Sequence, residues 1–112
     1  MTKHLTHSPA TAVIHAGQEP DPVYGGVSVP IYQSSTFAFA SAEQGAARFA
    51  GKEEGFIYTR IGNPTIRALE KSLATLEGGF DASATATGMA AVTTIYTALL
   101  DKDAHVVGTA SI

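Results

Sequence analysis

ASATATGMAAVTTIYTALLDKDAHVVGT, residues 82–109, is the stretch that indicates the fold class. Residues 82–86 and 104–109 each predict a short strand, and between them Val92, Ile95 and Leu99 recur at the spacing of one helix face. A strand, a helix and a second strand within about 30 residues form a βαβ unit, in which the two strands run parallel. The sequence therefore predicts an α/β fold.

The chain before this unit divides near residue 63. Asn63-Pro64 predicts the start of a helix, which Gly78-Gly79 ends. Residues 1–62 are rich in turn signals, with short helices expected over 9–14 and 41–50 and extended chain at 29–33. We expect 1–62 to form an arm and 63–112 to be the start of an α/β domain. That domain is expected to be incomplete, because a covered parallel sheet usually has about four or more strands.

The composition limits what the protein can bind. Charged residues make up 15% of the 112 residues, against about 25% in typical soluble domains, so we expect part of the surface to be covered by further chain or by a partner subunit. A net charge of −3 is evidence against nucleic-acid binding, and the lack of cysteine excludes a thiolate nucleophile and Cys-ligated zinc. With no long apolar run and no secretory signal, we expect a cytoplasmic protein with no membrane partner and no metal site.

Two short motifs carry residues suited to binding an anion. Thr87-Gly88-Met89 stands where a strand is expected to meet a helix, and the first turn of a helix offers unpaired N–H groups and a partial positive charge to a phosphate. The same residues also fit a threonine cap followed by a glycine that packs closely. Tyr58 and Arg60, two residues apart on extended chain, point the same way and can donate to a phosphate or carboxylate. They also fit a surface arginine beside a core tyrosine.

The segment YTRIGNPT, residues 58–65, resembles the Cys/Met-metabolism family of pyridoxal phosphate enzymes. Four further blocks resemble the same family in the same order: AVIHAG at 12–17, VPIYQSSTF at 29–37, LEKSLATLEGG at 69–79 and TGMAA at 87–91. The resemblance implies the N-terminal portion of a fold-type I enzyme, similar to aspartate aminotransferase, with pyridoxal 5′-phosphate as its cofactor.

The resemblance also implies roles for the two motifs. The backbone amides of Gly88 and Met89, with the Thr87 hydroxyl, would hold the cofactor phosphate of their own subunit. Tyr58 and Arg60 would reach from the arm into the site of the neighbouring subunit. The implied assembly is a homodimer with shared active sites, and dimers paired into a tetramer.

The lysine that binds the cofactor covalently in this family has no counterpart among the lysines of this chain, Lys3, Lys52, Lys71 and Lys102. By resemblance, that lysine and the other catalytic groups are expected further downstream. We therefore predict no catalytic residue within these 112 residues, and no turnover by them alone.

The reaction expected by resemblance is the α,γ-elimination of L-methionine to methanethiol, 2-oxobutanoate and ammonia. Residues 49–55 are similar to those of methionine γ-lyases, and Ile61, which would face the substrate in the neighbouring subunit, is an apolar residue that suits a thioether. Cystathionine γ-lyase, cystathionine γ-synthase and O-acetylhomoserine sulfhydrylase activities are the alternatives. An alternative outside catalysis is a fragment that binds phosphate ligands or full-length subunits.

Overall fold

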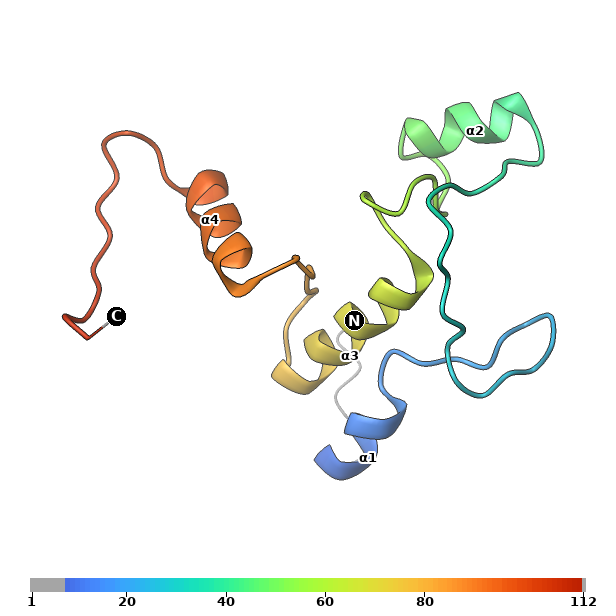
Figure 1. Ribbon diagram of the computed structural model, residues 1–112, viewed down its shortest axis with the longest axis horizontal. Helices are drawn as coiled ribbons and strands as arrows, with labels where there is room; N and C mark the ends of the chain where they lie inside the picture. The colour runs from blue at the N-terminus through green and yellow to red at the C-terminus, as the bar shows by residue number, and fades with distance from the viewer. Residues whose placement is uncertain (1–7, 112) are drawn as a thin grey trace.

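Four helices, α1 to α4, form the regular structure of the described residues, 8–111, in this computed structural model (Figure 1). The helices are α1 at Pro9–His15, α2 at Ala42–Phe49, α3 at Pro64–Glu77 and α4 at Gly88–Leu99. In each case a polar side chain just before the helix accepts a hydrogen bond from the first turn, as expected for an N-cap. The caps are Ser8, Ser41, Asn63 and Thr87. All four predicted helices are thereby confirmed.

The two strands predicted at 82–86 and 104–109 do not form in the described residues. Both segments are irregular, and α4 stands between them (Figure 1). Within residues 8–111 the one β pairing is an isolated antiparallel bridge between Thr36 and Tyr58. A strand needs a neighbouring strand to pair its N–H and C=O groups, and neither segment has one in this structure. The strand predictions are therefore wrong for these residues, whereas the helix between them is confirmed.

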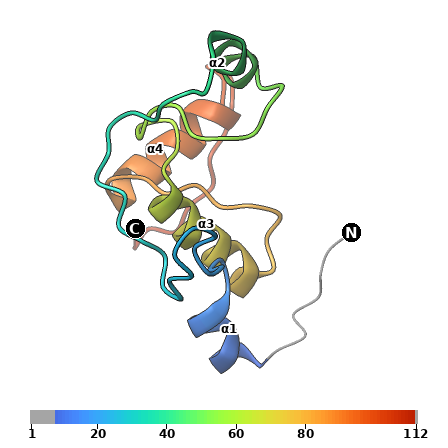
Figure 2. The same ribbon diagram turned by 90° about the vertical axis from the view of Figure 1, so that its right-hand side faces the viewer.

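Helix α1 docks on α3, as the two views show together (Figures 1 and 2). Each helix buries one alanine, Ala12 in α1 and Ala74 in α3. The chain leaves α1 through Gly17, whose φ of +73° is in the left-handed region. A Cβ at Gly17 would overlap the backbone oxygen of Ala68 and lie 2.7 Å from the nitrogen of Ser72. The close approach of the two backbones therefore requires glycine.

A second set of contacts joins the extended segment 30–37 to residues 57–65. The N–H of Phe37 donates to the carbonyl of Ile57 at 3.1 Å, and the N–H of Thr59 donates to the carbonyl of Ser35 at 2.9 Å. The Thr65 hydroxyl adds a third link, because its oxygen donates to the carbonyl of Pro30 at 2.8 Å. Segment 30–37 is therefore held by hydrogen bonds to the residues that lead into α3.

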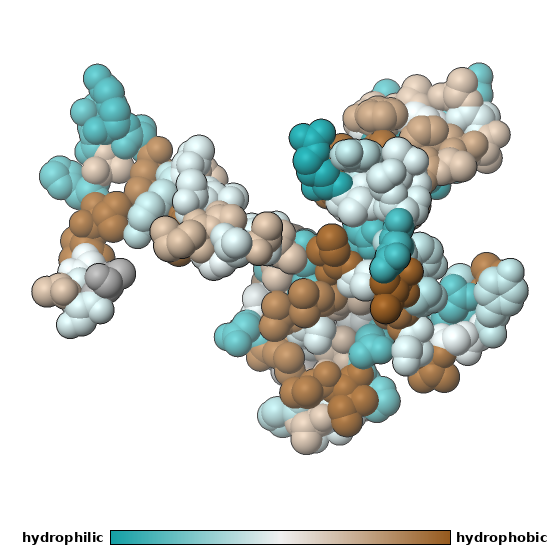
Figure 3. Space-filling view, in the orientation of Figure 1, coloured by the Kyte–Doolittle hydropathy of each residue, from teal (hydrophilic) through white to brown (hydrophobic). Residues whose placement is uncertain are grey.

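The shape is open, and much apolar surface is exposed. The radius of gyration is 17.6 Å, against about 13 Å for a compact domain of this length. Apolar residues gather along the α1–α3 region in the space-filling view (Figure 3). Exposed apolar side chains of α3 and α4 include Ile66, Leu69, Leu73, Ile95 and Leu99. None of the helices within residues 8–111 has the combination of length and apolar character that a membrane span needs.

Candidate functional site

The N-terminus of α4 presents two unpaired hydrogen-bond donors. The Thr87 hydroxyl accepts from the N–H of Ala90 at 3.0 Å, and the Thr87 carbonyl accepts from the N–H of Ala91 at 3.1 Å. The N–H groups of Gly88 and Met89 have no acceptor among the described residues. A Cβ built at Gly88 would meet no atom within 4 Å, so the space beside this turn is open. Two free donors at the positive end of a helix form a site that can accept an anion.

Tyr58 and Arg60 lie together on a tight turn. The carbonyl of Tyr58 accepts from the N–H groups of Ile61 and Gly62, at 2.8 and 3.0 Å, which folds residues 58–62 back on themselves. The Arg60 guanidinium carbon lies 5.5 Å from the centre of the Tyr58 ring. Both side chains line an open hollow of about 450 Å³ with residues 32–35. The guanidinium has no hydrogen bond or ion pair to the described residues, so all its donors are available to an anion.

Asn63 fixes this turn and is a residue whose full role the sequence did not reveal. It is 2% exposed, and its side-chain amide donates to the carbonyl of Tyr32 at 2.9 Å and to the Thr59 hydroxyl at 3.0 Å. Its side-chain oxygen accepts from the N–H of Thr65 at 2.9 Å, which is the capping role that the sequence did predict. One buried amide therefore starts α3 and also connects the extended segment to the turn that carries Tyr58.

The two motifs do not meet within one chain. Figure 1 shows helix α4, which begins at Gly88, and the turn formed by residues 58–62 as separate segments, and no hydrogen bond joins them among residues 8–111. Ile61, the predicted substrate-facing residue, lies on that turn and is 72% exposed. Of the lysines, Lys52, Lys71 and Lys102 are exposed, and Lys3 lies outside the described residues.

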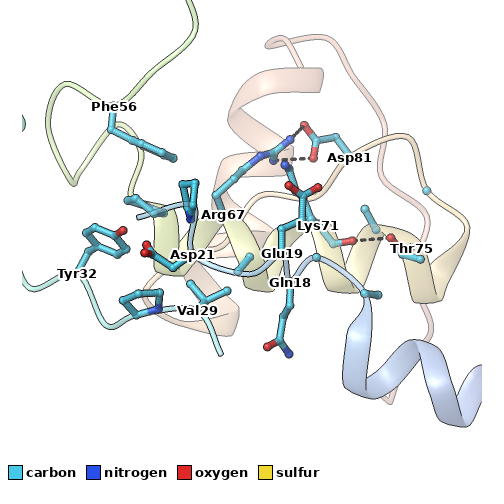
Figure 4. A pocket seen from close by; sticks show the side chains of 18 of the residues that line it. Gln18, Glu19, Asp21, Val29, Tyr32, Phe56, Arg67, Lys71, Thr75 and Asp81 are labelled. Atoms are coloured by element: carbon cyan, nitrogen blue, oxygen red, sulfur yellow. Dashed lines mark hydrogen bonds and ion pairs between the residues drawn. The ribbon is translucent and has the colours of Figure 1, made fainter. Parts of the chain in front are cut away.

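A charged cluster links α3 to the loop before α4, and the sequence alone did not identify it. Arg67 donates from both terminal nitrogens to the carboxylate of Asp81, at 2.7 and 3.0 Å (Figure 4). The Nη1 of Arg67 also lies 3.3 Å from Glu70. The hydrogen bonds from Arg67 hold the pKa of the Asp81 carboxyl below its usual range. The spacing of Arg67 and Glu70 on one helix was the available signal. The pairing with Asp81 spans 14 residues and has no periodic signature.

The sequence profile of one family, the Cys/Met metabolism PLP-dependent enzymes, matches residues 10–112. This chain belongs to that family. An L-methionine gamma-lyase of Fusobacterium nucleatum subsp. polymorphum is 50% identical over 97 residues, which are 87% of this chain and 24% of the relative. A cystathionine gamma-synthase of Mycobacterium tuberculosis (strain H37Rv) is 50% identical over 99 residues, 88% of this chain and 24% of the relative. The chain therefore spans about a quarter of the length of these relatives.

Solved structures agree with the family assignment. The crystal structure of metB from Corynebacterium glutamicum matches with a TM-score of 0.74 at 43% identity, over 85% of this chain and 23% of that one. A cystathionine gamma-lyase from Lactobacillus plantarum, complexed with L-serine, matches with a TM-score of 0.69 at 36% identity, over 83% of this chain and 22% of that one. The open arrangement seen here is therefore the fold of the corresponding part of larger PLP-dependent enzymes.

The described residues fit the phosphate group of PLP, the cofactor of this family. A phosphate needs hydrogen-bond donors, positive charge and room to approach the backbone. Counting partners among residues 8–111, the turn at Gly88 and Met89 supplies unpaired N–H groups beside open space, and Arg60 supplies an unpaired guanidinium on a separate turn.

Proposed function

We propose that Thr87, Gly88 and Met89 hold the phosphate of PLP in their own subunit. The observation that carries this proposal is the pair of unpaired N–H groups at the start of α4, next to a glycine with open space beside it. The capping hydroxyl of Thr87 keeps the first turn of the helix formed, which leaves these N–H groups directed at an incoming anion. PLP, when bound, supplies an electron sink for the negative charge that develops on the substrate.

Residues 1–62 form, in this proposal, an arm that completes the active site of a neighbouring subunit, and 63–112 begin the PLP-binding domain. The exposed pair Tyr58 and Arg60 supports it, because phenol and guanidinium both donate to a phosphate and neither side chain has a hydrogen bond to α4 among the described residues. Since Asn63 and the bonds to segment 30–37 hold the turn in place, the pair would enter the partner site with little ordering cost. The assembly so formed is a homodimer, and dimers pair into a tetramer.

The reaction we propose for the whole protein is the elimination of methanethiol from L-methionine. Methionine and one water give methanethiol, 2-oxobutanoate and ammonia. The exposed apolar side chain of Ile61, on the same turn as Tyr58 and Arg60, would contact the thioether group of the substrate. Identities of 44–50% to several L-methionine gamma-lyases support this choice.

Cystathionine synthesis from an O-acylated homoserine and cysteine is the second candidate. Its support is an equally close relative, since the Mycobacterium tuberculosis cystathionine gamma-synthase is also 50% identical over 88% of this chain. The residues of the two motifs do not separate the candidates, because both reactions use the same cofactor phosphate.

The experiment incubates the purified whole protein, loaded with PLP, with L-methionine alone and with O-acetylhomoserine plus cysteine. We expect methanethiol and 2-oxobutanoate in equal amounts from L-methionine, measured with a thiol reagent and a keto-acid assay. Formation of cystathionine without any methanethiol would instead establish the second candidate. Absence of both products together with absence of PLP binding would refute the proposed function.

A further inference from the structure

The loop between α3 and α4, at residues 78–87, buries no large apolar side chain. Phe80 is fully exposed, and residues 82–86 carry only small side chains that bury little surface. The orientation of the first turn of α4 must therefore depend on polar contacts of this loop. We call the cluster formed by Arg67, Glu70 and Asp81 the α3 clamp.

The α3 clamp holds the loop at two points. Arg67 binds the Asp81 carboxylate through two parallel hydrogen bonds, a geometry that fixes orientation as well as distance. The same carboxylate accepts from the N–H of Ala82 at 2.9 Å. Further along, one oxygen of Glu70 accepts from the N–H of Ala84 at 2.8 Å, while its other oxygen lies 3.3 Å from Arg67. The Glu70 side chain is only 16% exposed, so this contact is partly shielded from water.

Hydrogen bonds continue from the clamp to the anion-binding turn. Ala84 lies three residues before Thr87, and between them the Thr85 hydroxyl donates to the Thr87 carbonyl at 2.9 Å. Thr87 then caps α4 through Ala90. A series of hydrogen bonds along adjacent residues therefore runs from the side chains of α3 to the residue that precedes the two N–H groups left without an acceptor among residues 8–111.

We propose that Glu70 and Arg67, with Asp81, are positioning residues that orient the N-terminal turn of α4 toward a phosphate ester. The inference rests on the proposed role of that turn in holding the phosphate of PLP. Its consequence is specific: the clamp should affect the part of the affinity that comes from the phosphate and leave the rest of cofactor binding unchanged.

The test compares two probes on the whole protein after removal of its cofactor: pyridoxal 5′-phosphate and pyridoxal, which lacks the phosphate. Fluorescence titration gives a dissociation constant for each, and their ratio measures the advantage conferred by the phosphate. We expect Glu70→Ala to lower this ratio about 10-fold, the loss typical of a charge-assisted hydrogen bond network. Glu70→Gln keeps an oxygen acceptor for the N–H of Ala84 and should recover much of the ratio.

Glu77→Ala, at the last position of α3, is the matched control, because it removes the same charge from the same helix outside the clamp. It should leave the ratio unchanged. Asp81→Asn, which keeps the size of the side chain, serves as a second clamp variant and should lower the ratio by a smaller factor than Glu70→Ala.

The outcomes separate this inference from the proposed function. A wild-type protein that binds both probes equally would refute the phosphate role of the turn itself. A wild-type protein that prefers the phosphate ester, with the same ratio in Glu70→Ala and Asp81→Asn, would overturn the positioning role alone. A purely structural effect of the clamp would weaken both probes by the same factor and would also overturn it.

Discussion

At the scale of single residues, Asn63 connects the extended segment 30–37 to the start of α3. Its side chain is almost completely buried, and both the amide nitrogen and the amide oxygen are hydrogen-bonded to other residues of the chain. The sequence predicted only the capping function, since a cap is a local pattern of Asn followed by Pro. The side-chain amide also donates to the carbonyl of Tyr32, 31 residues away, and no local pattern encodes such a contact.

Asn63→Asp should release segment 30–37 from the turn. The carboxylate can still cap α3, but it cannot donate to the Tyr32 carbonyl and would place a negative charge beside it. We expect a loss of about 2–3 kcal/mol in the free energy of local opening. Hydrogen exchange at the amides of Phe37 and Thr59, which pair across the two segments, measures it. Ser41→Ala, which removes the exposed cap of α2, is the control; it should cost about 1 kcal/mol and leave the exchange of those two amides unchanged. Equal protection of the Phe37 and Thr59 amides from exchange in the two variants would contradict the role of Asn63.

At the scale of elements, the sequence predicts helices well and strands poorly. Each helix carries its own start signal, so Thr87 and the residues after it predict α4 from a local pattern. The strand predicted at 104–109 has no comparable local signal, because the hydrogen-bond partners that a strand needs belong to other strands. The candidate anion-binding residues could be proposed from the sequence for the same reason, as they lie at a helix start and on a short turn. The α3 clamp was missed because Asp81 joins α3 from a separate loop.

Gly17 permits the docking of α1 on α3, and its replacement tests that packing directly. In Gly17→Ala the new methyl group would overlap the backbone of Ala68, so α1 must move away from α3. Gly25→Ala is the matched control, since Gly25 has a similar φ of +70° and nothing within 4 Å of a built Cβ. Both variants carry the left-handed penalty of about 1–2 kcal/mol. We expect Gly17→Ala to lower the free energy of local unfolding by about 1–3 kcal/mol more than the control, measured by hydrogen exchange across α1. Equal losses in the two variants would show that the close approach of α1 and α3 does not stabilise the protein.

At the scale of the whole molecule, the two motifs proposed to bind the phosphate are separate segments of the chain (Figure 1). Among residues 8–111, no hydrogen bond joins Arg60 to the turn that carries the N–H groups of Gly88 and Met89. In the proposed assembly, the two motifs that bind one phosphate come from two copies of the chain, as the isologous pairing of a homodimer allows. The exposed apolar faces of α3 and α4 and the low content of charged residues are consistent with a chain that is covered in its assembly.

Mixed dimers test the shared site, with Arg60→Ala in one subunit and Gly88→Pro in the other. Proline at the first helical position is well tolerated, and Thr87 already has the extended backbone that precedes proline, so Gly88→Pro removes one N–H donor without disrupting α4. If Arg60 acts across the interface, the mixed dimer keeps one site with both wild-type residues, and the other site carries both changes. We therefore expect one of its two sites to bind PLP with wild-type affinity, measured by titration of dimers purified through two different tags. If Arg60 acts within its own subunit, each site carries one change and neither regains wild-type affinity.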